Sequence, residues 1–331
     1  MFPKFYSIAL ITCLIIGIIE AAPRALRFIP FAVIADLDKD SIKDAGKQFT
    51  SIVKYGELRD NGENYDLTMK SQNLHYFTRF AYNGRGAELS ELLNFNSKLF
   101  TVDDKTGIVF EVKYGGNLIP WVILANGNSN KQEGMKAEWA TRKGDKMYVG
   151  STGLMWYNEK TKETNSDSMW VKEISRNGEV KSIDWHKQYE AVKKALGMTN
   201  GFVWHEAVTW SSHKKLWVFL PRKCTAEKYS RQIEETTGCN KIITANEDFT
   251  KVNAVSITDN KNDPASGFSS FKFIPGTNNE HILAIKTIEK DGATATYAKV
   301  ITLTGKTLLS KKILDTKNEG VEFMRNPQGI V

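Results

Sequence analysis

The chain has 331 residues, of which 41% are hydrophobic and 25% are charged, and its formal net charge is +7. This composition is ordinary for a soluble globular protein. A basic surface favours polyanionic partners, and phosphates are one such class. The basic residues are spread along the chain and form no runs, so the sequence argues against a dedicated nucleic-acid surface.

The N-terminus has the pattern of a secretory signal peptide. Lys4 precedes 13 apolar residues, Ser7–Ile19, and small residues follow from Ala21 onward. The apolar stretch is too short to span a bilayer comfortably, which argues against the alternative of an uncleaved anchor. We therefore expect cleavage of residues 1–21, or one residue later, and secretion of a single domain, residues 22–331. We expect no membrane partner, because no later stretch approaches about 18 apolar residues.

Cysteine usage agrees with an oxidising compartment. Cys13 belongs to the expected signal peptide, which leaves Cys224 and Cys239. A lone pair in a secreted chain predicts one disulfide, over the alternative of two free thiols. We expect the polar loop that it closes to lie at the surface, away from any metal site. The sequence has no Cys-x-x-Cys and no His-x-x-x-His, which leaves little room for zinc or thiol catalysis.

Most of the chain consists of short β-rich runs separated by polar turns, which predicts an all-β fold. An amphipathic helix is expected at Lys187–Leu196, and a shorter one is possible around Ser41–Phe49. The expected strands are Phe31–Ala35, Lys98–Val102, Gly107–Val112, Trp121–Leu124, Lys146–Gly150, Leu216–Leu220, His281–Lys286, Ala298–Leu303 and Thr307–Ser310.

One phrase recurs along the chain: an acidic or hydroxyl residue, apolar residues, a polar turn and a strong strand. Its lead residues are Ser90, Glu138, Glu206, Ser269 and Glu319, at intervals of 48, 68, 63 and 50 residues. A propeller blade of four antiparallel strands needs about 40–50 residues, with room for insertions. The phrases therefore predict a five-bladed β-propeller, with an ordinary sandwich of strand–turn–strand units as the alternative.

The fifth phrase begins at Glu319 and is cut short by the end of the chain. An apolar strand, Phe31–Ala35, stands without a partner phrase at the N-terminus. Pairing these two segments would close the ring and remove an exposed sheet edge. We therefore predict that Phe31–Ala35 lies beside Gly320–Met324.

If the phrases are equivalent, their five lead residues project toward one central channel. Three carboxylates packed together repel one another unless a cation lies among them. Six to eight oxygen ligands suit Ca²⁺, whereas Mg²⁺ prefers tighter octahedral geometry and fewer protein oxygens. Taken singly, each glutamate would be assigned to a solvated turn. Their recurrence in phase predicts a calcium site with Ser90, Glu138, Glu206, Ser269 and Glu319 as ligands.

Acidic pairs end two of the expected strands and are candidates for catalysis. Asp36 and Asp38 follow the first strand, and Asp103 and Asp104 end another. Such residues often serve only as turn formers. A carboxylate beside a metal ion can instead orient a water for attack on phosphorus, and we select Asp36 and Asp104 for this role.

Cationic and aromatic side chains supply candidates for substrate binding. Arg85, Lys136 and Arg222 are expected to bind phosphate, because phosphoryl transfer depends mainly on positioning and charge neutralisation. Trp139 and Trp156 are candidates for stacking on a base, although each tryptophan considered alone would be assigned to the core.

Several segments together resemble the calcium-activated nucleotidases, including the Cimex-type salivary apyrases of blood-feeding arthropods. They include IADLDKDS, GRGAELSELLNFNSKLFTVDDKTGIVFE, PWVIL, KAEWA, GFVWHEAVTW, FLPRK, GFSSFKFIPGT and NEGVEFM, in that order. The resemblance runs from about Arg27 to Met324. It implies a five-bladed propeller with a central calcium, the five lead residues as its ligands, and ATP and ADP as substrates. Ala207 stands where a vertebrate-type phrase would have serine, which puts the hydrogen bonding around Glu206 in doubt.

Two functions of different classes follow. The first is a secreted enzyme that cleaves phosphate from extracellular ATP and ADP toward AMP, and the resemblance implies that it counters ADP-driven platelet aggregation during blood feeding. The second is a non-catalytic propeller that sequesters a small ligand. The carboxylate ring favours the enzyme, because an apolar ligand would not bind beside three buried acids.

Overall fold

The computed structural model describes residues 26–158, 162–258, 264–290 and 292–324. The expected signal peptide lies outside the described residues. Strands dominate the fold, and none of the described helices is long and apolar enough to cross a membrane. The prediction of an all-β chain is therefore confirmed at the level of fold class.

The largest sheet joins the two ends of the described chain. Eight strands follow one another in the order β26-β1-β3-β5-β9-β8-β7-β6, and β2 and β4 pair with β3 beside this path. The last strand of the path, β6, packs against the first, β26, so the sheet is nearly closed and barrel-like. Its strands are β1 (Arg27–Ala35), β2 (Ile42–Lys43), β3 (Gln48–Asp60), β4 (Tyr65–Met69), β5 (Leu74–Thr78), β6 (Leu89–Phe95), β7 (Lys98–Asp103), β8 (Ile108–Lys113), β9 (Asn117–Ile123) and β26 (Asn318–Phe323).

Three four-stranded antiparallel sheets follow in chain order and are propeller-like neighbours of the first. They contain β10 (Trp139–Lys143), β11 (Lys146–Gly150), β14 (Trp170–Ile174) and β15 (Val180–Asp184); β17 (Val208–Ser211), β18 (Leu216–Phe219), β20 (Lys241–Asn246) and β21 (Val252–Ser256); and β22 (Gly267–Phe273), β23 (His281–Lys290), β24 (Ala293–Thr302) and β25 (Thr307–Leu314). Two further pairs join β12 (Trp156–Asn158) to β13 (Glu163–Asn165) and β16 (Phe202–Trp204) to β19 (Lys223–Thr225).

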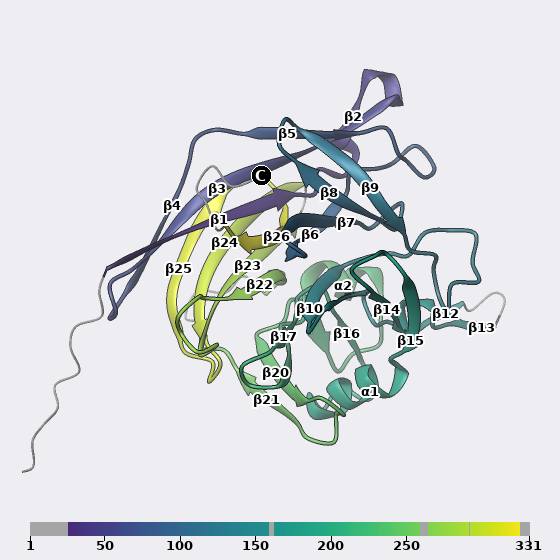
Figure 1. The fold of residues 1–331 in the computed structure, drawn as a ribbon. Helices are drawn as coiled ribbons and strands as arrows, with labels where there is room; N and C mark the ends of the chain where they lie inside the picture. The colour runs from purple at the N-terminus through teal and green to yellow at the C-terminus, as the bar shows by residue number, and fades with distance from the viewer. Residues whose placement is uncertain (1–25, 159–161, 259–263, 291, 325–331) are drawn as a thin grey trace, which may run out of the picture.

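The predicted pairing of the two chain ends is confirmed. Strand β1 pairs antiparallel with β26, from Phe31 opposite Phe323 to Ile34 opposite Gly320. Figure 1 shows the purple β1 running beside the yellow C-terminal strands. Each of the two strands thereby gains a hydrogen-bonded neighbour, so neither leaves an open sheet edge there.

The expected helix at Lys187–Leu196 is confirmed as α1 (His186–Ala195), with Tyr189 and Val192 buried on one face. The shorter helix expected around Ser41–Phe49 is wrong. That segment holds the 3₁₀ turns η1 (Asp38–Ser41) and η2 (Asp44–Gly46), separated by β2 and followed by β3. Asp44 and Ala45 have positive φ angles, which an α-helix cannot accommodate. The other helical elements are η3 (Asp167–Met169) and α2 (Arg231–Thr236).

Apolar side chains between neighbouring sheets hold the fold together. Five buried clusters occur among the described residues; four of them join strands of two different sheets, and the fifth lies within the ten-stranded sheet. Phe100 and Val109, for example, share a cluster with Met147 and Val149 of the next sheet. Strands β6 and β26, for example, are buried along almost their whole length.

The two end strands of the ten-stranded sheet and the first strand of each four-stranded sheet form a ring. Strand β6 packs against β10, β10 against β17, β17 against β22, β22 against β26, and β26 against β6. We call these five strands the inner strands. The five lead residues found in the sequence all lie at or just before the beginnings of these strands: Ser90, Glu138, Glu206, Ser269 and Glu319. The fold therefore places the five lead residues at one end of the ring.

Candidate functional site

Three carboxylates from different inner strands meet at this end of the ring. One side-chain oxygen each of Glu138, Glu206 and Glu319 lies within 4.8 Å of the other two. All three residues are at least 95% buried. Glu138 immediately precedes β10, Glu206 lies two residues before β17, and Glu319 is the second residue of β26. The structure thus brings together the three glutamates expected to meet.

Three cationic side chains surround the carboxylates: Arg222, Lys136 and Lys317. Arg222 forms ion pairs with Glu206 and, at 2.9 Å, with Glu319. Lys136 forms an ion pair with Glu138. Burial lowers the pKa of Arg222, but the ion pairs with Glu206 and Glu319 outweigh this effect and raise it, so the guanidinium stays charged.

The cations also connect the carboxylates to the two candidate catalytic acids. The ammonium nitrogen of Lys136 lies 2.9 Å from an oxygen of Asp104, and that of Lys317 lies 2.7 Å from Asp36 and 3.3 Å from Glu319. Asp36 and Asp104 line the same cavity as the three glutamates. The structure therefore places both acids where the sequence analysis expected them.

Acidic groups outnumber basic ones around this cavity, which has a volume of about 150 Å³. The acids that line it are Asp36, Asp104, Glu138, Glu206, Glu234, Glu289 and Glu319, and the bases are Lys136, Arg222, Lys223 and Lys317. Seven acids against four bases leave three formal negative charges uncompensated by the lining residues. A site of this kind attracts a divalent cation.

Burial raises the pKa of several of these acids. The pKa of Glu138 rises to about 8, mainly because the residue is removed from water, and the neighbouring Glu206 and Glu319 add to the rise. Burial likewise raises the pKa of Glu206 and of Asp36. Burial also opposes ionisation of Asp104, but Lys136 and Lys105 outweigh it and lower the pKa of that residue. Asp104 therefore stays ionised and can accept a hydrogen bond from a water.

The two serines among the lead residues differ from each other. The Ser269 hydroxyl donates a 3.0 Å hydrogen bond to the backbone oxygen of Asn318, the residue before Glu319. The Ser90 hydroxyl oxygen is buried and has no hydrogen-bond partner among the described residues. A buried hydroxyl normally has a partner, so Ser90 remains available to a bound ligand.

Arg85 lies at the edge of the site and not on the cavity. Its guanidinium pairs with Glu88 at 2.6 Å and with Asp38 at 3.0 Å. Glu88, Asp38 and Asp36 form a second group of acids whose oxygens lie within 4.8 Å of one another. In this structure Arg85 compensates that group, and Lys136 and Arg222 are the candidate cations that reach the cavity.

Trp139 does not fit the base-stacking role considered for it. Its side chain is fully buried and donates a 3.1 Å hydrogen bond to the backbone oxygen of Ser151. Successive side chains of an extended segment point to opposite sides. Because Glu138 faces the cavity, its neighbour Trp139 faces the core. Trp156, the other tryptophan considered, is exposed.

Two residues that contact the glutamates were not predicted from the sequence. Trp204 donates a 2.9 Å hydrogen bond from its ring nitrogen to Glu206, and Lys317 pairs with Glu319. Both stand two residues before the glutamate that they contact, as Lys136 does before Glu138. In an extended chain residues i and i−2 share a side, so this recurrence was present in the sequence as a signal.

The disulfide between Cys224 and Cys239 is confirmed. The expectation that its loop would lie away from the metal site is wrong. Glu234, which lies between the two cysteines in the sequence, lines the cavity of the three glutamates. The polarity of the loop alone did not distinguish this position from a remote surface.

With this geometry established, comparison with known proteins identifies the family. The Apyrase family model matches residues 37–324. The chain belongs to the apyrase family. An apyrase of Phlebotomus duboscqi is 49% identical over 333 aligned positions, covering 100% of this chain and 99% of the relative.

Two further apyrase-family relatives extend the comparison. An apyrase of Cimex lectularius is 39% identical over 88% of this chain and 81% of its own length. Soluble calcium-activated nucleotidase 1 of Rattus norvegicus is 36% identical over 92% of this chain and 76% of its own length. The resemblance that the sequence motifs indicated is thereby confirmed.

Proposed function

We propose that this chain is a calcium-dependent apyrase that hydrolyses ATP and ADP to AMP and phosphate. The observation that carries the proposal is the meeting of Glu138, Glu206 and Glu319 in a cavity with an excess of acids and a rim of cations. Such a site combines a place for a divalent cation with groups that pair with phosphate oxygens. Membership of the apyrase family and the name of the rat relative, a calcium-activated nucleotidase, support this proposal.

The donor set suits calcium. It consists of oxygens alone, with no sulfur or imidazole among the residues lining the cavity. Two buried oxygens, the Ser90 hydroxyl and Oδ1 of Asp104, have no hydrogen-bond partner in the part of the chain that the structure describes. We propose Ser90, Glu138, Glu206, Ser269 and Glu319 as the residues that hold the ion. When bound, calcium supplies positive charge that stabilises the charge developing on the transferred phosphoryl group.

Other side chains at the cavity would bind the phosphate oxygens and orient the attacking water. Lys136 and Arg222 are already held at the cavity by carboxylates and are positioned to pair with phosphate oxygens. Asp104 stays ionised and has a free oxygen, so we assign it the orientation of the attacking water. Asp36, whose pKa burial raises, would assist by holding Lys317 in place.

The architecture that we propose for this function is a five-bladed β-propeller formed by a single domain of residues 22–331. The ring of five inner strands and the five apolar clusters support it. We further propose secretion after removal of residues 1–21, and a role in saliva that counters ADP-driven platelet aggregation during blood feeding. The lone disulfide agrees with an oxidising compartment.

One assay tests the enzymatic proposal. Purified protein is incubated with ADP or ATP, and released phosphate is measured with calcium and with a calcium chelator. We expect phosphate release in calcium, none in chelator, and recovery when excess calcium is added. Binding of nucleotide without phosphate release would favour the non-catalytic alternative. Equal hydrolysis in calcium and chelator would overturn the calcium dependence.

A further inference from the structure

The ring of inner strands has another cavity, at the end away from the lead residues. Its volume is about 730 Å³, which is within the range of ligand pockets. Every inner strand contributes to its lining near the C-terminal end of the strand: Asn94 of β6, Arg142 of β10, Trp210 of β17, Lys272 of β22 and Glu322 of β26. Because the lead residues stand at the beginnings of the same strands, this cavity opens at the opposite end of the ring. We call it the distal cavity.

The charged residues that line the distal cavity differ in their partners. Lys272 is buried and lies 2.9 Å from Glu91. Glu322 is also buried and accepts hydrogen bonds from two backbone amides. Arg142 is exposed, and its Nε donates a 2.8 Å hydrogen bond to the backbone oxygen of Gly144. Arg142 therefore places an accessible positive charge at the opening of the distal cavity.

Two turns with several basic residues border this opening. The first turn joins β10 to β11, and the second joins β17 to β18. They are neighbours, because the Trp210 amide donates a 3.1 Å hydrogen bond to the Thr141 hydroxyl and the Lys143 ammonium lies 4.9 Å from the centre of the Trp210 ring. The basic residues in and beside these turns are Arg142, Lys143, Lys146, Lys214 and Lys215. The fold thus assembles a basic group that forms no run in the sequence.

Three of these five bases form no ion pair within the described residues. Lys143 pairs with Glu247 at 2.6 Å, and Lys214 pairs with Glu280. The three that have no such partner there are Arg142, Lys146 and Lys215. Asp145 is the one acid in the two turns, so the opening of the distal cavity carries an excess of positive charge. Such a surface attracts anions.

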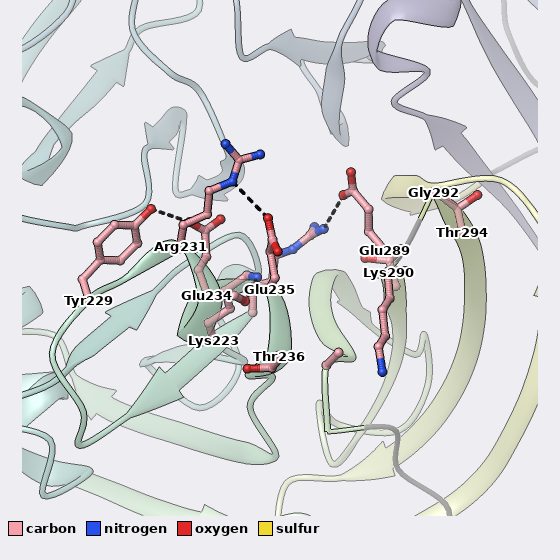
Figure 2. Close-up of a pocket in the computed structure, with 13 residues that line it drawn as sticks. Lys223, Tyr229, Arg231, Glu234, Glu235, Thr236, Glu289, Lys290, Gly292 and Thr294 are labelled. Carbon is pink, nitrogen blue, oxygen red and sulfur yellow. Dashed lines mark hydrogen bonds and ion pairs between the residues drawn. The ribbon is translucent and has the colours of Figure 1, made fainter.

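Two arginines at the other end of the ring already have carboxylate partners. A cavity of about 760 Å³ adjoins the cavity of the three glutamates and shares Arg222 and Glu289 with it. Figure 2 shows Arg231 of this cavity directed at Glu235, 3.0 Å away, and Arg222 lies 3.7 Å from Glu289. A polyanion would have to displace these carboxylates, whereas at the distal cavity it would meet cations without a competing acid.

The uncharged lining of the distal cavity mixes apolar and hydrogen-bonding groups. Ile29, Phe273 and Pro275 supply apolar surface. Ser212 and Asn279 supply a hydroxyl and an amide group. Sugar rings present a matching mixture, with apolar C–H faces and hydroxyl groups along their edges. The lining therefore suits a carbohydrate.

The distal cavity suits nucleobases and lipid surfaces less well. Two of the aromatic residues that line it, Trp210 and Phe323, are at least 91% buried, whereas nucleobases stack on accessible aromatic faces. A flat lipid surface would touch only the rim and leave the cavity unfilled. A narrow, flexible chain can enter it.

We propose that the distal cavity and the two basic turns bind a linear sulfated polysaccharide. One sulfate or carboxylate group of the chain pairs with the guanidinium of Arg142, which matches two oxygens at once, and further groups pair with Lys146 and Lys215. Because this site lies at the opposite end of the ring from Glu138, Glu206 and Glu319, a bound chain leaves the cavity of the three glutamates open. The protein could thus be retained on a sulfated surface while that cavity faces away from it.

Heparin, a linear sulfated polysaccharide, is the probe for this site. One variant combines Arg142→Gln, Lys146→Gln and Lys215→Gln, and calorimetric titration compares its heparin affinity with that of the wild type at several salt concentrations. We expect the affinity to fall about tenfold or more, because a linear polyanion releases condensed counterions when cations neutralise it. The slope of log affinity against log salt should become shallower by about one for each residue that contacts an anionic group. Thermal unfolding should not change, since none of the three residues has an ion pair to lose.

The matched control removes three positive charges from another part of the surface. Lys181, Lys187 and Lys194 are exposed and do not line the distal cavity. We expect the variant with all three changed to Gln to keep its heparin affinity within about twofold, because solvent-exposed charges far from a ligand are screened by salt. An equal loss of affinity in both triple variants would mean that net charge alone attracts heparin, and the proposed site would be wrong.

Hydrogen exchange locates the polysaccharide on the wild-type protein. We expect heparin to slow exchange of the backbone amides in residues 142–146 and 212–216. Protection elsewhere, or none, would contradict the proposal. So would release of heparin by a methylene-bridged ADP analogue with calcium, which would place the chain at the cavity of the three glutamates. Tighter binding of single-stranded RNA or of phosphatidylserine vesicles than of heparin, at the same salt concentration, would assign the surface to a different polyanion.

Discussion

Two groups of buried charges lie on the inner strands, and they differ in what satisfies them. The first is the carboxylate site around Glu138, Glu206 and Glu319. The second, which we call the inner cluster, consists of Glu91 of β6, Lys272 of β22 and Glu322 of β26. Every residue of the inner cluster is at least 91% buried, as are the three glutamates of the site.

The protein itself supplies the partners of the inner cluster. Lys272 lies 2.9 Å from Glu91, which also accepts a 2.7 Å hydrogen bond from the Ser270 hydroxyl. Glu322 accepts hydrogen bonds from the backbone amides of Asn94 at 2.9 Å and Phe323 at 2.8 Å. These contacts tie three inner strands to one another. The carboxylate site instead keeps seven acids against four bases around a cavity. Buried charge therefore marks a structural cross-link in one place and a ligand site in the other, and the excess of one sign distinguishes them.

The largest expected effect comes from breaking the inner cluster. Replacing Lys272 by Met leaves two buried carboxylates without their cation, and we expect the free energy of unfolding to fall by about 3–5 kcal/mol. Denaturant unfolding measures this change. Lys187→Met, on the exposed face of α1, is the control and should change it little. In the fraction that stays folded, the calcium concentration for half-maximal ADP hydrolysis should be unchanged; a shift would mean that the two groups are coupled.

Removing one carboxylate charge from the site should lower the turnover rate. For Glu138→Gln and Glu206→Gln we expect kcat for ADP to fall more than about 100-fold. Mutating a residue that only hydrogen-bonds to a metal ligand lowers activity about 10–100-fold, and loss of a ligand itself should lower it further. High calcium should restore part of the activity. Normal turnover with normal calcium dependence in both variants would place the catalytic centre elsewhere.

Calcium should stabilise the folded protein through the carboxylate site alone. At a free concentration about 100 times its Kd, a ligand that binds only the folded state adds about 2.7 kcal/mol to the free energy of unfolding. We expect this gain in the wild type and in Lys272→Met, and most of it to be absent in Glu138→Gln. Thermal unfolding with calcium or chelator measures it, and an equal gain in all three proteins would contradict the assignment.

The smallest expected effects come from removing the hydroxyl groups of Ser90 and Ser269. Ser90→Ala removes a buried hydroxyl without a hydrogen-bond partner among the described residues, whereas Ser269→Ala removes one that already donates to Asn318. We expect calcium affinity to fall about tenfold in Ser90→Ala and less in Ser269→Ala. Calorimetric titration with calcium measures both. A larger loss in Ser269→Ala would reverse the roles assigned to the two hydroxyls.

Asp103 and Asp104 differ in a way that could not be predicted from the sequence. Asp103 and Asp104 are adjacent and alike in the sequence. Asp103 accepts hydrogen bonds from the backbone amides of Ala87 and Lys105, as a turn residue does, while Asp104 faces the cavity. The pattern predicted an acidic strand end, but the direction of each side chain depended on how β7 packs beside its neighbours.

The sequence by itself determined the β-rich class, helix α1, the closure of β1 on β26, the disulfide and the meeting of the three glutamates. The disulfide follows from the cysteine count, and the other features follow from periodicity and repetition along the chain. Only the tertiary structure decided that Trp139 is core, that Arg85 pairs with Glu88 and Asp38, and that the disulfide loop borders the site. Burial and the direction of a side chain depend on residues far apart in the chain, so a local pattern does not fully encode them; the sheets must pack before a side chain acquires its neighbours.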